Sequence, residues 1–181
     1  EKSYLYYVLS FAGILFYSLL YKGVGTLYLF SSESMTSLIT YAAFIVAVPI
    51  FFLALFTREI LQLSQYPKLH RILNIYLVIF VLLTVICYLF DLNRLRSLFT
   101  IILMAYLAFV TFYAFIKGNH QARFIIIGWI SFFSSGLFMW LSSMNIYNIF
   151  ALYPYYTETA LLFEAIIFSL ALANKIKQLM K

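Results

Sequence analysis

Long apolar runs alternate with short polar connectors along almost the whole chain. Each run is about 20 residues long and apolar on every face, whereas a strand would alternate apolar and polar positions. A helix of that length crosses about 30 Å of hydrocarbon, so each run predicts a transmembrane helix. The predicted spans are residues 4–20, 37–56, 72–90, 98–116, 124–141 and 156–173.

The composition supports a membrane protein. Hydrophobic residues make up 65% of the chain and charged residues 10%, against about 45–50% and 25% in soluble domains. This apolar excess cannot all face a core surrounded by water. The connectors 22–34, 57–71, 91–97, 117–123 and 142–155 are too short to form a soluble domain. We therefore expect an all-α integral membrane protein, in which residues 1–181 form a single bundle of six transmembrane helices.

The positive charges predict an orientation. If both chain ends lie on one side of the membrane, the opposite side carries only Lys22, Arg94 and Arg96 among the lysines and arginines. By the positive-inside rule both ends are then cytoplasmic. The net charge of +6 is thus an orientation signal that also favours contact with anionic membrane lipids. No basic groove interleaved with aromatic residues is visible, so we expect no nucleic-acid partner.

Few residues suggest enzyme chemistry. Cys87 is alone inside a span, and His70 and His120 lie in separate connectors without further ligands at metal-binding spacing. We therefore expect neither a metal site nor a cofactor. A serine nucleophile at Ser134 or Ser135 would need a base at its own depth, and both histidines lie near the membrane surface. We expect no catalysis in this chain.

Glu164 is a single carboxylate inside the last predicted span. It precedes Asn174 by about ten residues, or about 15 Å, and so lies near the bilayer centre. A charge there costs about 2.5–3.5 kcal/mol, and no basic residue shares its depth. We expect a protonated Glu164 that faces other helices and donates a hydrogen bond, either as a structural contact or as a switch. The candidate partners at similar depth are Tyr106, Ser134 and Ser135.

Small residues recur at helical spacing in the last two predicted spans. Because apolar contact alone does not drive helices together in lipid, such stripes allow close helix packing. We predict helix seams along both stripes, and a kink at Pro49, which lies mid-span. The stripes are Ala165, Ser169 and Ala173 in the last span and Gly128, Ser131, Ser135 and Ser142 in the one before it.

The last predicted span has no helix stop. Leu172, Ile176 and Leu179 continue its spacing into a basic segment, so we expect a cytoplasmic helical exit over residues 174–181. The spacing fits either the start of a coiled coil or an ordinary interfacial helix end.

The connector before the last span is rich in aromatic residues. It forms either an interfacial aromatic belt or the mouth of a pocket for a small molecule or lipid. The residues that would line such an outer pocket are Trp140, Tyr147, Tyr153 and Tyr156.

Three stretches resemble one known family. They are YPKLHRIL (66–73), GNHQARFIIIGW (118–129) and FEAIIFSLALANKIKQL (163–179). These stretches resemble the membrane domain of the bacterial seven-transmembrane receptors with diverse intracellular signalling modules (7TMR-DISM). In that family a basic Ala-Arg stretch leads to a Gly-Trp pair, and the last helix carries a Glu, a Ser-Leu-Ala-Leu-Ala run and a basic exit. The matching residues here are Ala122, Arg123, Gly128, Trp129, Glu164, the run 169–173, Asn174 and Lys175.

The resemblance implies a receptor in the bacterial inner membrane. Family members carry seven spans, an extracytoplasmic ligand-binding domain before the first span, and an output module after the last, commonly a histidine kinase or a diguanylate cyclase. The first run here looks like the second span of the family, so we expect the chain to be a fragment that lacks the first span. The resemblance also implies that the last helix transmits the signal, in our interpretation within a homodimer, and leaves the ligand unknown.

Two other functions remain open from the residues. A small-solute transporter or channel would need a continuous polar path, for which only Glu164 and scattered hydroxyl groups are available. A membrane-embedded ligand-binding module would use the aromatic connector described above.

Overall fold

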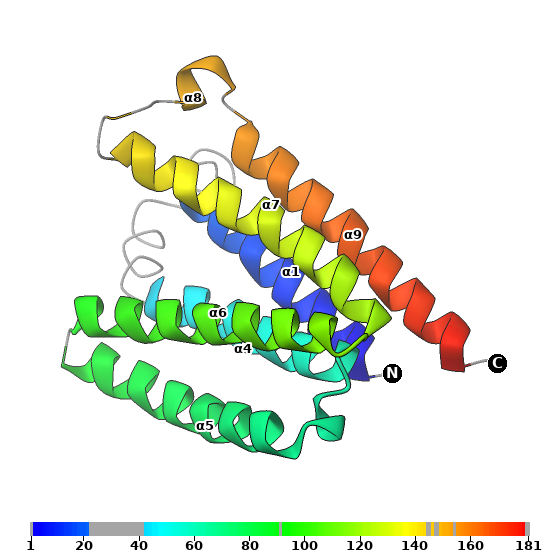
Figure 1. Ribbon diagram of the computed structural model, residues 1–181. Helices are drawn as coiled ribbons and strands as arrows, with labels where there is room; N and C mark the ends of the chain where they lie inside the picture. Colours follow the sequence, from blue (N-terminus) through cyan, green and yellow to red (C-terminus); the bar gives the residue numbers. More distant parts are fainter. Residues whose placement is uncertain are drawn as a thin grey trace. The chain divides into compact units, whose positions relative to one another are not determined.

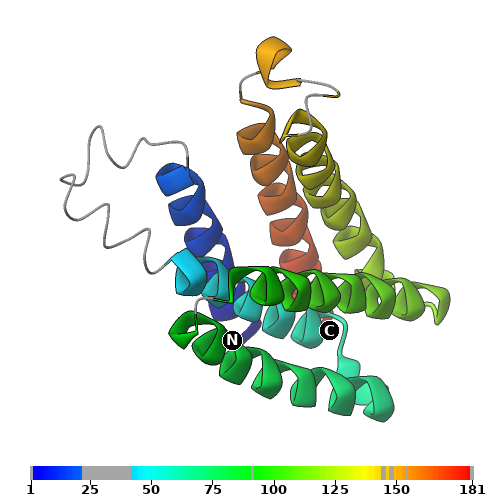
Figure 2. The same ribbon diagram turned by 90° about the vertical axis from the view of Figure 1, so that its left-hand side faces the viewer.

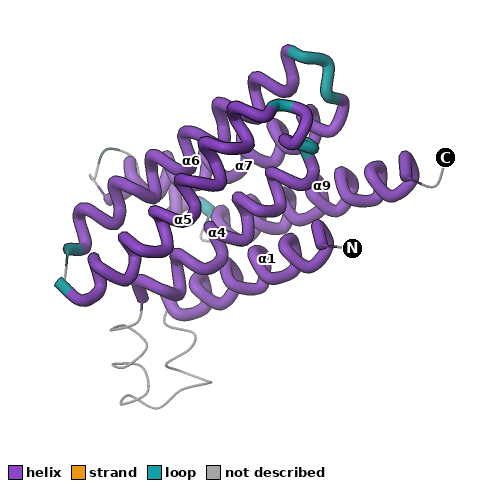
Figure 3. Tube along the Cα trace, turned by 90° about the horizontal axis from the view of Figure 1, so that it is seen from below, coloured by secondary structure: helices purple, strands orange, loops and turns teal. Residues whose placement is uncertain are grey.

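The structure, a computed structural model, describes residues 2–21, 42–90, 92–143, 146, 149–153 and 155–179. Within these ranges the regular secondary structure is entirely helical, and no strand occurs in them (Figure 3). This confirms the all-α class. Among the described residues the long helices are α1 (Lys2–Tyr21), α4 (Ala42–Ile60), α5 (Pro67–Leu89), α6 (Asn93–Ile116), α7 (His120–Ser143) and α9 (Tyr156–Leu179), with a short 3-10 helix η1 (Leu63–Gln65) and a short helix α8 (Ile149–Leu152).

Several helices are suited to a bilayer. In the described part of the chain, four segments are long and apolar enough to cross a membrane: Lys2–Leu20, Pro67–Leu89, Leu98–Ile116 and Glu158–Lys177. On α5, Val78 and Leu82 are 63% and 58% exposed, which would be costly in water and suits lipid. The chain is therefore a multi-pass membrane protein.

Every predicted span overlaps one long helix, and the differences lie at the ends. Helix α5 begins at Pro67 rather than at Ile72, because its first turn is polar and lies outside the apolar run. Proline fits the first helical position, where the missing N–H costs no hydrogen bond. Residues 37–41 of the second predicted span and residues 180–181 of the predicted exit lie outside the described residues.

The turn between α6 and α7 has a clear local cause. Gly118 has φ of +85°, a left-handed conformation that glycine adopts without a steric penalty. The Gly118 N–H donates to the Phe115 carbonyl at 2.9 Å and the Asn119 N–H to the Ala114 carbonyl at 3.0 Å, which is the Schellman pattern. The Asn119 side chain then accepts from the Gln121 N–H at 3.0 Å and caps α7.

Close contacts divide the chain into two compact units, Glu1–Leu107 and Ala108–Lys181, with the boundary inside α6. In the first unit α1 packs along α4, and α4 also contacts α5 and η1 (Figure 1). In the second unit α7 and α9 lie side by side and run in opposite directions, joined through α8 (Figures 1 and 2). That residues 1–181 act as one domain stays a prediction.

Pro49 takes part in the packing of α1 on α4. Its ring is buried, and a Cβ built on Gly13 of α1 would lie only 2.8 Å from the Pro49 Cβ. Stacked rings continue this contact, with 6.2 Å between the ring centres of Tyr6 and Phe52. Helix α4 runs through Pro49 from Ala42 to Ile60, and a kink there stays a prediction.

Candidate functional site

Helices α7 and α9 meet along a seam built from small and aromatic side chains. Two of the predicted small residues take part in it, because their size lets the helices approach closely. We define the α7–α9 seam as Gly128, Ser131, Ser134 and Phe138 on α7 and Tyr156, Ala160 and Phe168 on α9.

Hydroxyl groups hold the half of this seam nearer to α8 in one register. Ser131 Oγ donates to the Ala160 carbonyl at 3.0 Å. The Tyr156 hydroxyl donates to Ser134 Oγ at 3.3 Å, and its ring meets Phe138 edge-on with 5.1 Å between ring centres. Ser134 Oγ in turn donates to the Ser131 carbonyl at 2.8 Å. Interhelical hydrogen bonds of this kind, which average about 0.6 kcal/mol in membranes, specify register more than they add stability.

Glycine and a phenylalanine ring form the other half of the seam. The Phe168 ring lies directly against Gly128, where a built Cβ would approach its Cε1 very closely and would lie 2.9 Å from Cζ and 3.0 Å from Cδ1. Phe168 is 2% exposed, so the ring is enclosed. The hydrogen on Gly128 therefore leaves the space that this aromatic ring occupies.

Glu164 lies on the buried stripe of α9, with 4% of its surface exposed. Leu161, Phe168 and Ala171 complete that stripe at helical spacing. The antiparallel pairs Gly128 with Phe168 and Ser131 with Ala160 place Glu164 level with residues 128–131. Glu164 is therefore about one turn from the level of Ser134 and Ser135 on α7.

The predicted small-residue stripe of α9 follows a different face. Ala165 is half-buried, and Ser169 and Ala173 are exposed within this chain. That stripe starts about 100° around the helix from the Glu164 stripe. A seam along Ala165, Ser169 and Ala173 therefore stays a prediction, whereas the α7–α9 contact uses the neighbouring face.

The proposed partners of Glu164 have other hydrogen bonds. The Tyr106 hydroxyl donates to the Leu69 carbonyl at 3.0 Å and ties α6 to the start of α5. The Ser134 hydroxyl donates within α7, as described above, and Ser135 is buried with 7% exposure. Because the donor protons of Tyr106 and Ser134 are already used, only their oxygen lone pairs are open to a protonated Glu164. These pairings stay predictions.

The residues of the family motifs lie on α7 and α9. Trp129 is 4% exposed and stacks on Phe133 with 5.4 Å between ring centres. Arg123 is exposed at the start of α7, and Asn174 and Lys175 are half-buried near the end of α9.

The proposed outer pocket is only partly described. Tyr153 is 66% exposed, and Tyr156 belongs to the α7–α9 seam. Tyr147 and the side chain of Trp140 lie outside the described residues.

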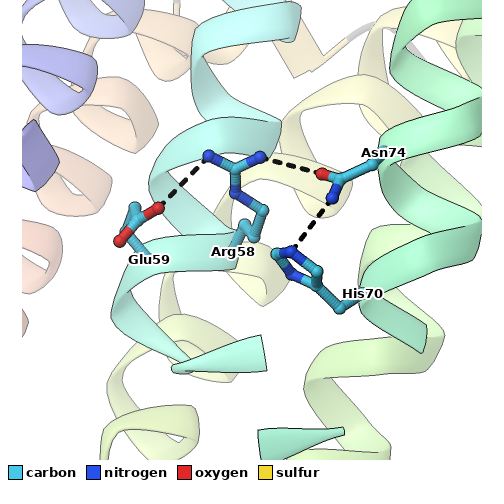
Figure 4. A network of polar contacts seen from close by, with 4 residues as sticks. All are labelled: Arg58, Glu59, His70 and Asn74. Atoms are coloured by element: carbon cyan, nitrogen blue, oxygen red, sulfur yellow. Dashed lines mark hydrogen bonds and ion pairs between the residues drawn. The ribbon is translucent and has the colours of Figure 1, made fainter. Parts of the chain in front are cut away.

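A polar cluster between α4 and α5 was not predicted. We define it as Arg58, Glu59, His70 and Asn74 (Figure 4). Arg58 Nη1 donates to Asn74 Oδ1 at 2.8 Å, and Nη2 pairs with Glu59 Oε1 at 3.2 Å. Asn74 Nδ2 lies 3.0 Å from His70 Nε2. In the sequence, only the spacing of His70 and Asn74 on one helix face could have indicated it, because Arg58 belongs to another helix.

Two buried polar atoms of this cluster, and one of the residue that precedes Arg58, have no hydrogen-bond partner among the described residues. They are Thr57 Oγ1, Arg58 Nε and His70 Nδ1. Such atoms are uncommon, because each one costs about 1–3 kcal/mol of desolvation. Among all the residues that the structure describes, no three His, Cys, Asp or Glu side chains lie together as a metal site would require.

Comparison with known proteins gives one match. The family model described as 7TM diverse intracellular signalling (7TMR-DISM_7TM) matches residues 1–175, nearly the whole chain. No curated protein and no solved structure matches the chain significantly. Together with the membrane-spanning helices, the match shows that this chain belongs to the 7TM diverse intracellular signalling family and is the membrane domain of a receptor.

Proposed function

We propose that this domain couples an extracytoplasmic or membrane-level stimulus to a cytoplasmic output module through α9. The output would be a module such as a histidine kinase or a diguanylate cyclase in the full-length receptor. The observation that carries the proposal is the continuity of α9, which runs as one helix from Tyr156 to Leu179. It includes the apolar segment Glu158–Lys177 and passes beyond it without a break.

The α7–α9 seam supplies the other part of the proposed mechanism. Three contacts fix one register of α9: the Tyr156 hydroxyl, the Ser131 hydroxyl and the Phe168 ring against Gly128. Packed interfaces tend to have discrete arrangements rather than continuous ones. A stimulus that favours a second register would therefore move the end of α9 as a rigid body.

In this mechanism Glu164 is a neutral group on the buried face of α9. Its burial on the face that carries Leu161 and Phe168 makes a free carboxylate costly, so a change of register must keep or exchange the hydrogen bond that we predict for it. We propose that this exchange separates the two packings of the receptor. The domain works in the bacterial inner membrane with both ends of the chain cytoplasmic, in contact with anionic lipids and within a homodimer.

Two insertions after Lys177 in the full-length receptor test rigid transmission. Seven glycines interrupt the helix, whereas seven alanines keep it helical and change its phase by only about 20°. We expect stimulus-dependent output to be lost with glycine and retained with alanine. If the glycine variant responds to the stimulus as the unmodified receptor does, transmission along a rigid α9 is wrong.

The orientation needs its own test. Reporter fusions or cysteine labelling at Leu92 and at Gly118 distinguish the two sides of the membrane. We expect Leu92 to be accessible from outside and Gly118 from the cytoplasm. The reverse pattern would contradict the proposed placement of both chain ends.

A further inference from the structure

The hydrogen bonds from Arg58 through Asn74 to His70 allow only one assignment of donors and acceptors. A guanidinium group only donates, so Asn74 presents Oδ1 to Arg58 Nη1, at 2.8 Å. The Asn74 amide nitrogen, also only a donor, then lies 3.0 Å from His70 Nε2. His70 Nε2 must therefore accept, and the single proton of the neutral ring must lie on Nδ1.

A protonated His70 does not fit this arrangement. Both ring nitrogens of a protonated histidine donate, so an Nε2 proton would point at the Asn74 amide hydrogens. Asn74 cannot turn its amide around, because its NH2 group would then face the N–H of Arg58 and both groups would be donors. Arg58 cannot adapt either, since guanidinium groups stay protonated in proteins.

Neighbouring charges do not remove this conflict. Glu59 is the acidic group of the cluster, and it is engaged by Arg58 Nη2 at 3.2 Å. Figure 4 shows Glu59 and Asn74 on opposite sides of the guanidinium group. Around this end of α4, α5 contributes Tyr66, Lys68 and Arg71, and α6 contributes Tyr106, which donates to the Leu69 carbonyl. The start of α1, which packs along α4, contributes Lys2, Tyr6 and Tyr7, and the rings of Tyr6 and Tyr7 face Phe52 and Phe56.

The closed cluster also leaves two N–H groups without acceptors. His70 Nδ1, which carries the proton, and Arg58 Nε are both buried and have no partner among the described residues. Opening the cluster would let both groups reach water or lipid headgroups. The closed arrangement is therefore held weakly, which suits a connection that opens and closes.

We propose that the Arg58–Asn74–His70 chain is a proton-sensitive connection between α4 and α5. It is closed while His70 is neutral, and it opens when the ring takes up a proton. Protonation breaks the Asn74–His70 contact inside α5, so Asn74 loses the partner that orients its amide toward Arg58, and a second positive charge then lies in the cluster with Arg58. Lowering the pH therefore weakens the hydrogen bond from Arg58 of α4 to Asn74 of α5, and raising the pH restores it. The receptor domain thereby gains an input that is independent of a ligand: the proton concentration on the side of the membrane that carries connector 57–71.

The first test measures the tautomer of His70 in the unmodified chain. The chain contains two histidines, and His120, exposed at the start of α7, serves as an internal reference. In the reconstituted chain with ¹⁵N-labelled histidine, NMR shifts identify which ring nitrogen carries the proton. We expect His70 to carry it on Nδ1 above about pH 8. A proton on Nε2 would overturn the proposal.

The second test measures opening by amide hydrogen exchange in the α4–α5 turn. The reporters are the Leu61, Tyr66 and His70 amides, each of which donates a backbone hydrogen bond there. In His70→Gln, the side-chain carbonyl can accept from Asn74 and cannot titrate. Comparing both proteins at the same pH cancels the intrinsic pH dependence of exchange, and the turn amides of Gly118 and Asn119 serve as an internal control.

We expect the two proteins to exchange alike at about pH 8. At about pH 5 the unmodified chain should exchange about five- to tenfold faster in the turn, the factor that one lost hydrogen bond corresponds to. Asn74→Asp should remain protected at both values, because a carboxylate accepts from Arg58 and from either form of His70. Equal exchange of the unmodified chain and His70→Gln at both pH values would overturn the proposal.

Discussion

Replacing Gly128 by alanine directly tests the packing of the α7–α9 seam. The substitution adds one methyl group, which points at the ring of Phe168. A built Cβ would lie 2.9 Å from Cζ and 3.0 Å from Cδ1 of that ring, whereas carbon atoms pack best at about 3.5–4.0 Å. The ring is 2% exposed, so it cannot turn away without displacing other side chains.

Two opposing effects set the size of the change. Alanine favours a helix over glycine by about 1 kcal/mol, and overpacking a well-filled site costs about 1–3 kcal/mol. We therefore expect Gly128→Ala to lower the free energy of unfolding by about 1 kcal/mol. Phe168→Leu alone should cost a similar amount, about 1 kcal/mol, because it leaves a gap in the seam.

The double variant makes the prediction specific to this contact. The added methyl group partly fills the gap that Phe168→Leu leaves, so the double variant should be less destabilised than the sum of the two single variants, by about 1–2 kcal/mol. Reversible unfolding of the reconstituted chain in mixed detergent micelles, followed by circular dichroism, gives all four free energies. Additive effects within about 0.3–0.5 kcal/mol would show that the two residues are not in contact.

The same unfolding assay tests three further positions. Gly13→Ala should cost about 2 kcal/mol, because the new Cβ would lie 2.8 Å from Pro49 and a proline ring cannot swing aside; unchanged stability would refute that contact. Ser131→Ala should cost about 0.6–1 kcal/mol through loss of its interhelical hydrogen bond, and an increase in stability would contradict it. Tyr106→Phe should cost about 1 kcal/mol, whereas Tyr4→Phe, at a side chain 57% exposed, should cost almost nothing; equal effects would show that the Tyr106 hydroxyl bond does not contribute.

Helix positions were predictable because the apolar runs are long, and helix ends were predictable only where composition changes at the boundary. The predicted start of the last span at Tyr156 coincides with the start of α9. Helix α7 begins at His120 rather than at Phe124, since its first turn is polar. The Gly118-Asn119 pair, which ends α6 and caps α7, could have indicated that boundary in the sequence.

The polar cluster shows a different limit. In the sequence, His70 is only a side chain near the membrane surface, and Arg58 is only one of the positive charges on the predicted cytoplasmic side. Their connection through Asn74 depends on the turn between α4 and α5, where Gln62 adopts φ of +50° and Leu61 and Leu63 are fully buried. No spacing rule relates Arg58 to Asn74 before that turn is known, because the pairing is between two helices.

By itself, the sequence determined that the protein lies in a membrane, that it is helical, in which order its spans follow, and which family it resembles. All of these follow from the length of the apolar runs and from short motifs. Tertiary structure decided which face of α9 is buried, which α7 residues it contacts, and which polar groups pair between α4 and α5. The physical reason is that lipid and protein interior are both apolar. A helix that is apolar on every face does not reveal its packed side, and the fit of the Phe168 ring against Gly128 selects that side.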